Sequence, residues 1–421
     1  MHLPIVRGAW LAMLLLLAAC SSPARRADPA PAAASASPPT LLLVSIDGLR
    51  ADIPGSGRMP TLDALFAQGA RAAWVNPSYP TLTFPNHYTL VTGLRPDRHG
   101  IVHNDLEDSM LGRFESKKAS GRDGRFWGGE PIWVAARRAG LKTATMFWPG
   151  SEAEIAGTRP DHWRPFDGKL TPDQRVAEVL AWLDLPANER PRFITLYMEQ
   201  YDVAAHAAGT FSPQAVEAME TIDAALAKLL AGLDARGLRA DTNLIVLSDH
   251  GMADVRTSDT AYLDDVVPES LYAWTSLGPV AHITPHPGQA AEVRRRLVGR
   301  HDHYACWDKA SLPPAWHYGR NPRIASIVCQ VDTGWRLQLR RHPLPHQPLK
   351  GEHGFAPEDP QMRAFFVASG PDFVPGATLP AFDNVDVYPL LAHLLRIRAA
   401  PNDGTLQTFT PVLKPRAAPA H

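Results

Sequence analysis

The sequence lacks an excess of charge of either sign. Its 42 lysines and arginines nearly balance 43 aspartates and glutamates, so the formal net charge is −1. No block of Lys and Arg stands out, which argues against a surface that binds a nucleic-acid polymer or another polyanion. A small charged substrate is compatible with this balance, because a local site needs only a few charges or a metal ion.

Long hydrophobic runs are also lacking, apart from one near the N-terminus. The run from Ala9 to Ala19 follows a weakly basic start and is too short to span a membrane, so it is typical of an export signal. The letters "LAAC" that end at Cys20 resemble a bacterial lipobox, whose cysteine is lipidated; an ordinary signal peptide that happens to contain a cysteine is the alternative. We expect a lipoprotein-type signal over residues 1–19, a flexible tether over 20–39, and a periplasmic protein that meets the membrane only through this anchor.

Cysteine is scarce as well, since only Cys306 and Cys329 remain beyond Cys20. In an oxidising compartment these two residues would form a disulfide, and two reduced, buried thiols are the alternative. Internal repeats are absent. The hydrophobic content of 45% is ample for a large core.

Three apolar runs indicate how this core is built. The run from Leu41 to Ile46 ends in Asp47-Gly48, a pattern typical of a buried strand in a parallel sheet. "RFITLYMEQYD" reads as a strand that runs out at Asp202, and "TNLIVLSDHGM" as one that stops at Asp249. Between them, residues 212–237 carry apolar positions at helical spacing, with a serine, a proline and a glycine suited to the ends. This alternation predicts an α/β fold with a mostly parallel central sheet flanked by helices.

Two stretches break the alternation. Residues 105–128 are polar and rich in glycine, and we expect them to form a loop over the site. Residues 253–350 are rich in proline, histidine and tryptophan with a few strand-like pieces, which indicates a small inserted cap subdomain. We expect this insertion to lie within a catalytic domain that spans 40–412 and is followed by a tail at 413–421.

Acidic and imidazole side chains cluster at the predicted strand ends and beside glycines. They are Asp47, Asp202, Asp249, His206, His250 and His353. Ligands of open α/β sheets gather beyond the carboxyl ends of strands, so we expect the three aspartates to converge at one edge. Carboxylates and imidazoles are ligands that zinc accepts, and six are more than one ion needs, so the pattern predicts two metal ions. Each residue alone has an ordinary alternative in a turn, a capped strand end or a solvated loop.

Thr83 stands just before "FPNHYTLVTG", which predicts the first turns of a helix. Its ordinary role would be that of an N-cap. Beside a metal ion, however, its hydroxyl would ionise near neutral pH at a helix start that favours an anion. It would then attack phosphorus and form a covalent phospho-threonine, with the Asn104 amide and the Phe84 backbone N–H as donors to a phosphoryl oxygen.

With these residues assembled, the chain resembles the nucleotide pyrophosphatase/phosphodiesterase family of the alkaline phosphatase superfamily. The matching stretches cover nearly the whole folded part and include "SIDGLR", "PTLTFPNHYTLVTGLRPDRHGIVHN", "GGEPIWVAARRAG", "YDVAAH", "LSDHGM" and "GEHGFAP". The resemblance implies an alkaline phosphatase-like fold and two zinc ions. It assigns one zinc, the one that activates the threonine, to Asp47, Thr83, Asp249 and His250, and the other to Asp202, His206 and His353.

The resemblance also implies a substrate pocket. Asn104 takes the oxyanion role, and in members that cleave nucleotides two aromatic residues stack on the base. Phe84 matches the first aromatic residue and Phe166 the second, with Trp163 as a rival; an ordinary core position is the alternative for both phenylalanines. The sequence departs from the family at Leu82, where a lysine is frequent, and at Ala205, where a glycine is frequent. The missing lysine lowers the positive charge near the site.

These features predict a phosphodiesterase or nucleotide pyrophosphatase that releases nucleoside 5′-monophosphates from small-molecule substrates. A phosphomonoesterase or phosphonate hydrolase on the same scaffold is one alternative; it would usually add an arginine or a third metal, and Arg50 and Arg113 have no assigned role. A phosphocholine-type diesterase is a second alternative. A non-catalytic envelope lipoprotein that kept the fold is a third.

Overall fold

The computed structural model describes residues 38–341 and 349–415. The predicted signal, Cys20 and nearly all of the predicted tether lie outside the described residues, as do residues 342–348 and 416–421. Within the described ranges, no helix combines the length and the apolar character that a membrane crossing requires.

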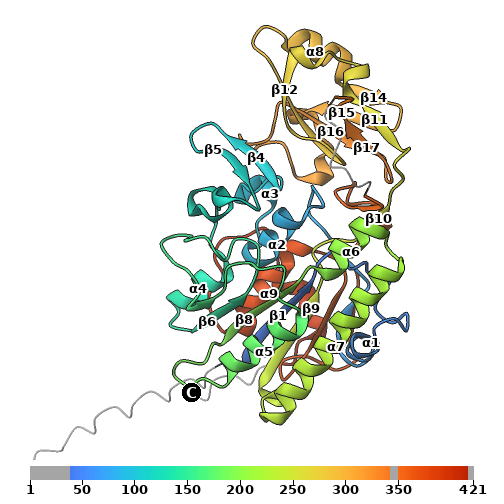
Figure 1. The fold of residues 1–421 in the computed structure, drawn as a ribbon. Coiled ribbons are helices and arrows are strands. Elements are labelled where there is room, and N and C mark those ends of the chain that lie inside the picture. The colour runs from blue at the N-terminus through green and yellow to red at the C-terminus, as the bar shows by residue number, and fades with distance from the viewer. Residues whose placement is uncertain (1–37, 342–348, 416–421) are drawn as a thin grey trace, which may run out of the picture. The chain divides into compact units, whose positions relative to one another are not determined.

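A mixed eight-stranded sheet forms the centre of the fold, in the order β20-β2-β19-β9-β1-β8-β6-β7 (Figure 1). Strand β1 (Thr40–Ile46) lies between β9 (Thr242–Leu247) and β8 (Phe193–Met198) and is parallel to both. Parallel pairing continues to β6 (Thr143–Met146) and β7 (His162–Trp163), whereas β19 (Phe366–Ser369) is antiparallel to its neighbours. The outer strands are β2 (Ala70–Ala72) and β20 (Thr378–Leu379). The predicted α/β fold with a mostly parallel sheet flanked by helices is confirmed.

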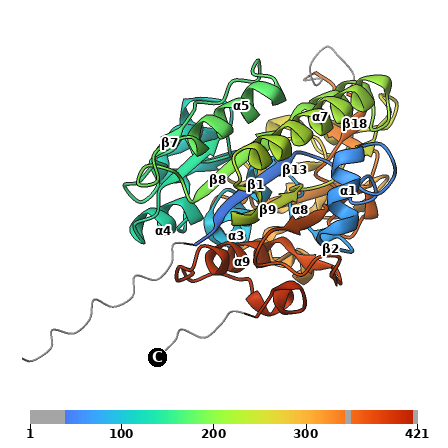
Figure 2. The same ribbon diagram turned by 90° about the horizontal axis from the view of Figure 1, so that it is seen from below.

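Alternate side chains of β1 face opposite sides of the sheet, because successive side chains of a strand point in opposite directions. Leu41 and Leu43 pack in one core with residues of α2 (Thr83–Thr92), α4 (Ile132–Arg138) and α9 (Val387–Leu394). Leu42, Val44 and Ile46 pack in a second core with α1 (Pro60–Gln68), α5 (Pro172–Leu183) and α7 (Pro213–Ala235). Figure 2 shows α5 and α7 on the side of the sheet opposite α9. Helices on both faces explain why the central strands read as unbroken apolar runs.

Helix α7 begins and ends as its sequence predicts. The Ser212 side chain accepts a hydrogen bond from the Ala215 backbone N–H at 3.2 Å, and Pro213 occupies the first turn. At the other end Gly237 has φ of +63°, and the Leu238 N–H donates to the Leu233 carbonyl at 2.9 Å. This is the left-handed ending for which glycine is preferred.

A second sheet of five antiparallel strands is inserted between β9 and β19, in the order β12-β13-β16-β15-β14. Its strands are β12 (Tyr272–Ser276), β13 (Val280–Pro285), β14 (Gly299–His301), β15 (Tyr304–Asp308) and β16 (Ile327–Val331). Together with α8 (Ala290–Leu297) this cap sheet has a core of its own. The short strands β10 (Ala253–Asp254) and β18 (Gly351–Glu352) pair where the chain leaves and returns, and β11 (Thr260–Tyr262) pairs with β17 (Arg336–Gln338). The predicted domain boundaries stay a prediction.

The expected loop at residues 105–128 is in fact structured, and that prediction is wrong for its first part. Strands β4 (Asp105–Asp108) and β5 (Gly112–Glu115) form a hairpin, followed by two short 3-10 helices. Leu106 and Phe114 lie opposite each other in this hairpin and are fully buried. The stretch resembles a loop in sequence because only these two side chains of the hairpin are fully buried, with Leu111 partly buried against the same core.

Other short elements of the fold are α3 (Pro96–His99), β3 (Val75–Asn76) and β21 (Phe382–Asp383).

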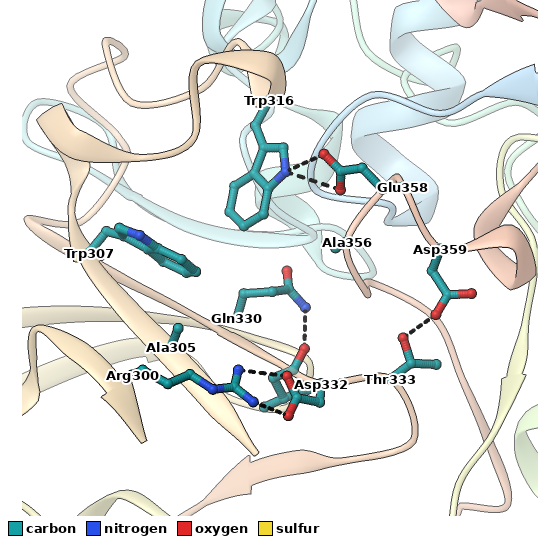
Figure 3. A pocket seen from close by; sticks show the side chains of 11 residues that line it. Arg300, Ala305, Trp307, Trp316, Gln330, Asp332, Thr333, Ala356, Glu358 and Asp359 are labelled. Carbon is teal, nitrogen blue, oxygen red and sulfur yellow. Dashed lines mark hydrogen bonds and ion pairs between the residues drawn. The ribbon is translucent and has the colours of Figure 1, made fainter. Parts of the chain in front are cut away.

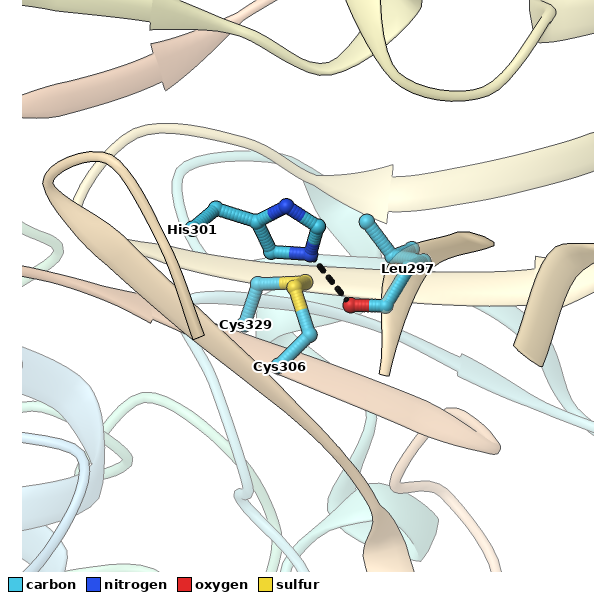
Figure 4. Close-up of a disulfide and its surroundings, with 4 residues drawn as sticks. All are labelled: Leu297, His301, Cys306 and Cys329. Atoms are coloured by element: carbon cyan, nitrogen blue, oxygen red, sulfur yellow. Dashed lines mark hydrogen bonds between the residues drawn. A yellow bond between two sulfur atoms is a disulfide. The ribbon is translucent and has the colours of Figure 1, made fainter. Parts of the chain in front are cut away.

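Cys306 and Cys329 form a disulfide within the cap sheet (Figure 4). They lie directly opposite each other on β15 and β16, and both are fully buried. Of the two alternatives left open by the sequence, the structure shows the disulfide. Beside it, the His301 Nε2 donates to the Leu297 carbonyl at 2.7 Å, which fastens β14 to the end of α8.

Removal of the disulfide should destabilise the cap sheet. The bridge closes a loop with a sequence separation of 23 residues, and chain-entropy arguments give such a loop about 3 kcal/mol of stabilisation. We expect the double variant Cys306→Ala/Cys329→Ala to lose about this much unfolding free energy in equilibrium urea denaturation. Reduced wild-type protein should shift in the same direction. A variant within about 0.5 kcal/mol of wild type would contradict the prediction.

Candidate active site

The site lies at the carboxyl edge of the central strands. Asp47 follows β1 directly, and Asp249 comes two residues after the end of β9. Asp202 differs from the expectation: β8 ends at Met198, and Asp202 lies on the following helix α6 (Gln200–Ala208). His206 is one turn further along the same helix, so both side chains point from one helical face. The helix was not evident from the sequence, because only Glu199 separates the last residue of β8 from the first residue of α6.

All six predicted acidic and imidazole residues come together. Three overlapping groups have ligand atoms within 4.8 Å of one another: Asp202, His206 and His353; Asp47, Asp202 and His250; Asp47, His87 and Asp249. Asp202 Oδ1 is 3.5 Å from His206 Nε2 and 3.6 Å from His353 Nε2. His250 Nε2 is 3.6 Å from Asp47 Oδ1 and 3.0 Å from Asp249 Oδ2. Because the groups share Asp47 and Asp202, they form one continuous cluster.

Backbone contacts orient the three predicted imidazole ligands in the same way. The Nδ1 of His206 lies 2.9 Å from the Gly351 carbonyl, that of His250 2.9 Å from the Gly251 carbonyl, and that of His353 2.9 Å from the Thr81 carbonyl. A carbonyl only accepts, so each Nδ1 carries a proton and each ring turns its Nε2 toward the cluster. This is the arrangement in which metal-binding histidines are held.

Three buried carboxylate oxygens in the cluster have no hydrogen-bond partner. They are Asp47 Oδ1, Asp202 Oδ1 and Asp249 Oδ2. A buried acceptor without a partner is costly, and each of these atoms lies within 3.6 Å of an imidazole nitrogen. The donor set of carboxylate oxygens and imidazole nitrogens therefore fits divalent cations such as zinc.

The charges of the cluster oppose one another. Burial raises the pKa of Asp47, and the nearby charges of Asp249 and Asp202 raise it further. Burial alone would raise the pKa of Asp249, but His250 and His87 hold it well below its usual value. Burial lowers the pKa of His353, and the neighbouring His250 and His206 lower it further. Cations would relieve the repulsion among the carboxylates and stabilise the neutral imidazoles.

Thr83 is the first residue of α2 and does not cap it. Leu82 takes the extended backbone of the capping position, and no side chain caps this helix end. The Thr83 Oγ1 instead lies 3.3 Å from His250 Nε2. The capping role, which was the ordinary alternative, is wrong, and the hydroxyl belongs to the cluster.

Asn104 and Phe84 lie beside this helix start, but in a different relation from the one expected. The Phe84 backbone N–H donates to Asn104 Oδ1 at 3.0 Å, whereas both groups were expected to face a phosphoryl oxygen. The first N–H groups of a helix lack partners within the helix, which explains why the amide oxygen takes this one. The contact fixes the Asn104 side chain and leaves its Nδ2 as the available donor.

The two candidate stacking residues differ in exposure. Phe84 is half-buried, and its ring centre is 6.2 Å from that of Trp127. Phe166 is 46% exposed and lies 6.2 Å from the ring of Tyr197, which itself contacts Asp47. Trp163 lies on β7, where the Arg159 guanidinium sits 5.6 Å from its ring centre. Of Phe166 and Trp163, Phe166 is therefore the residue that the Tyr197 ring links to Asp47 of the cluster.

Sequence reasoning missed two buried residues that hold the cluster. His87 has its Nδ1 3.1 Å from Asp249 Oδ2 and 3.0 Å from the Thr83 carbonyl, and its Nε2 2.8 Å from Ser45 Oγ. The Tyr197 hydroxyl donates to Asp47 Oδ2, which leaves Oδ1 for a ligand. The helical spacing of His87, four residues after Thr83, was a usable signal. Tyr197 had none, because it sits within a strand that is buried throughout.

The unassigned arginines are engaged elsewhere. Arg50 pairs with Asp52 at 2.5 Å, and Arg113 pairs with Glu107 at 3.3 Å within the hairpin. Both ion pairs are local, and neither partner belongs to the cluster.

Comparisons with known proteins agree with this geometry. The family model "Type I phosphodiesterase / nucleotide pyrophosphatase" matches residues 41–356. Ectonucleotide pyrophosphatase/phosphodiesterase family member 3 of Rattus norvegicus is 35% identical over 393 residues, which cover 90% of this chain and 45% of that protein. An uncharacterized pyrophosphatase/phosphodiesterase of Schizosaccharomyces pombe is also 35% identical over 393 residues, with 90% and 81% covered. The chain thus spans about half the length of the rat relative.

Solved structures of ectonucleotide pyrophosphatase/phosphodiesterase 5 are similar throughout the folded part. The human protein has a TM-score of 0.85 and 33% identity, covering 89% of this chain and 100% of that chain. An inactive threonine-to-alanine variant of the murine protein, in complex with AMP, has a TM-score of 0.84 and 32% identity with the same coverage. The alkaline phosphatase-like fold that the sequence implied is confirmed.

Loss of His87 should weaken cation binding, because this ring joins the Thr83 backbone to Asp249. We expect His87→Ala to lower the affinity for Zn²⁺ about 10- to 100-fold, the range found for residues that orient metal ligands. His87→Asn should lose less, since its amide can still donate from the position of Nδ1. Competition with a chromophoric chelator measures this affinity. The exposed His286→Ala is the control and should bind as wild type; an equally unchanged His87→Ala would show that the ring does not position Asp249.

Proposed function

Because the chain belongs to the type I phosphodiesterase/nucleotide pyrophosphatase family, we propose that it is a two-zinc enzyme that hydrolyses nucleotide phosphodiester or pyrophosphate bonds and releases a nucleoside 5′-monophosphate. The observation that carries this proposal is the Thr83 hydroxyl, 3.3 Å from His250 Nε2 within a cluster of metal-ligating side chains. The murine relative supports it, because its threonine-to-alanine variant is described as inactive and binds AMP.

Two zinc ions account for the number and kind of ligands. Asp47, Asp249 and His250, with Thr83, would hold one, and Asp202, His206 and His353 would hold the other. When bound, the ions supply positive charge that lowers the pKa of the Thr83 hydroxyl and of water and offsets charge on the leaving oxygen. The unpartnered carboxylate oxygens of Asp47, Asp202 and Asp249 would then have partners.

The chain's own residues carry out the transfer. The Thr83 hydroxyl releases its proton to solvent, Oγ1 forms a bond to phosphorus, and the bond from phosphorus to the leaving oxygen breaks, which leaves a phospho-threonine that still carries the nucleoside. Water then attacks phosphorus and the bond to Oγ1 breaks. One proton of the water passes to Oγ1, and its hydroxyl stays on phosphorus. The Asn104 Nδ2 donates to a phosphoryl oxygen, since its Oδ1 is held by the Phe84 N–H.

Phe84 and Phe166 provide aromatic faces for a nucleobase. The ring of Phe166 is half-exposed. Phe147 and Tyr197 lie 5.1 and 6.2 Å from it, and the Arg175 guanidinium lies 6.0 Å from its centre. Stacking of this kind contributes about 1–3 kcal/mol per base.

We also propose that the protein is exported and anchored by a lipid on Cys20. The disulfide in the cap sheet supports this, because disulfides persist in oxidising compartments.

The nucleophile is tested by substitution of Thr83. We expect Thr83→Ala to lower kcat/KM for bis(p-nitrophenyl) phosphate at least about a thousandfold, as loss of a nucleophile does elsewhere. Thr83→Ser should retain part of the activity, and acid-quenched wild type should carry a p-nitrophenyl phosphoryl group on the peptide that contains Thr83. Wild-type turnover by Thr83→Ala would remove the threonine from the mechanism. Faster release of p-nitrophenol from p-nitrophenyl phosphate than from the diester would favour a phosphomonoesterase. A zinc-loaded protein that hydrolyses neither substrate would favour a non-catalytic lipoprotein.

The base pocket is tested with Phe166→Ala. We expect KM for the p-nitrophenyl ester of thymidine 5′-monophosphate to rise about fivefold to a hundredfold, because 1–3 kcal/mol of stacking is lost. Turnover of methyl p-nitrophenyl phosphate, which has no base, should change little. Trp163→Ala is the matched control and should leave both substrates unaffected. If Trp163→Ala produced the larger KM effect, the second stacking residue would be Trp163.

A further inference from the structure

A cavity of about 450 Å³ lies apart from the active site, between the cap sheet and the segment at residues 356–359 (Figure 3). None of the residues assigned to the two metal ions lines it. Its volume falls within the range of small-molecule sites, about 300–1,000 Å³. A smaller cavity of about 230 Å³ shares Trp316 and Glu358 in its wall.

Two tryptophans form the apolar part of the wall. The rings of Trp307 and Trp316 meet edge to face with centres 5.4 Å apart. Trp316 is held in place, because its ring stacks on Tyr79 at 4.0 Å and its Nε1 donates to Glu358 at 3.0 Å (Figure 3). The cavity therefore presents fixed aromatic surfaces, which is a prerequisite for stacking a ligand against them.

The polar part of the wall is acidic. Three carboxylates line the cavity, those of Asp332, Glu358 and Asp359, against the one guanidinium of Arg300. Arg300 pairs with Asp332 at 2.7 Å, so it neutralises a carboxylate of the same wall. Glu358 receives a neutral indole N–H, and Asp359 receives the neutral Thr333 hydroxyl. Negative charge thus remains beside the aromatic faces.

We propose that this cavity binds a small organic cation, an ammonium or guanidinium group that carries apolar substituents. The carboxylates attract its charge, and the indole faces attract it through their quadrupoles while covering its apolar part. An anion such as a second nucleotide would meet three carboxylates, and a bare metal ion would leave the indoles without a role. The chemistry is therefore opposite to that of the phosphate-binding active site.

The cavity is close to the active site along the chain. Tyr79, under the Trp316 ring, is four residues before Thr83, and Glu358 is five residues after His353. A cation bound in the active site has to be distinguished from one bound here. Competition with AMP and substitution of Thr83 make that distinction.

The probe is choline chloride, titrated into the zinc-loaded protein by calorimetry beside its neutral isostere 3,3-dimethylbutan-1-ol. We expect saturable choline binding that is at least about fivefold tighter than binding of the alcohol. Glu358→Gln keeps an acceptor for the Trp316 indole but removes the charge, and it should weaken choline binding about fivefold or more. Glu220→Gln, the same change at an exposed position of α7, should have no effect. Thr83→Ala and saturating AMP should leave choline binding unchanged.

Trp307→Ala tests the aromatic wall, and Trp307→Phe keeps a weaker aromatic face if the alanine variant does not fold. Binding should fall in the order wild type, Trp307→Phe, Trp307→Ala. The proposal is overturned if choline binds no better than the neutral alcohol, if AMP displaces it, or if Glu358→Gln and the Trp307 variants bind it as wild type does.

Discussion

Crowding of carboxylates at one edge of the sheet is the constraint on which the site depends. Parallel strands bring their carboxyl ends together, and here Asp47, Asp249 and Asp202 come within a few ångströms of shared neighbours while excluded from water. Buried like charges raise one another's proton affinity, as the raised pKa of Asp47 shows. Burial alone would lower the pKa of His206 and His250, but the nearby carboxylates Asp202 and Asp249 raise it above its usual value. Burial holds the pKa of His353 well below its usual value, so the imidazoles offset the carboxylate charge only in part. Bound cations would supply further positive charge.

Hydrogen bonds around the cluster keep its ligand atoms available. The Nδ1 atoms of the histidines are engaged by backbone carbonyls, and the Tyr197 hydroxyl engages one oxygen of Asp47 but not the other. His87 connects Asp249 with the backbone of Thr83, so these two residues of the cluster share one support. Each contact restricts a side chain before a cation or substrate arrives. The reorganisation left for binding is correspondingly small, which favours both affinity and rate.

Much of this could be predicted from the sequence, because strands that end in acidic residues and a helix with a serine and a glycine at its ends follow from local rules. The rest depends on tertiary contacts. Asp202 was predicted at a strand end but lies on a helix, because an apolar run does not show at which residue a strand stops. The hairpin that carries Leu106 and Phe114 was hidden because its stability comes from two buried residues, not from a pattern. Asn104 lies beside Phe84 as expected, but the hydrogen bond between them was not predicted. It forms because the first N–H groups of a helix have no partner within the helix, and the Asn104 amide oxygen accepts from one of them in place of a substrate oxygen.

The insertion of the cap sheet between two strands of the central sheet has a consequence for the metal site. His353 follows the cap sheet in the sequence. Its position therefore depends on the contacts that hold the segment leading from the cap sheet back to the central sheet. Two contacts do this: His353 Nδ1 donates to the Thr81 carbonyl at 2.9 Å, and the Thr81 hydroxyl donates to the Phe355 carbonyl at 2.7 Å. Thr81 is two residues before Thr83, so the last candidate ligand in the sequence is fastened to the segment that carries Thr83. The returning segment meets the cluster at a second point as well, because the Gly351 carbonyl lies 2.9 Å from His206 Nδ1. Changes in the cap sheet therefore reach the cluster through these two contacts.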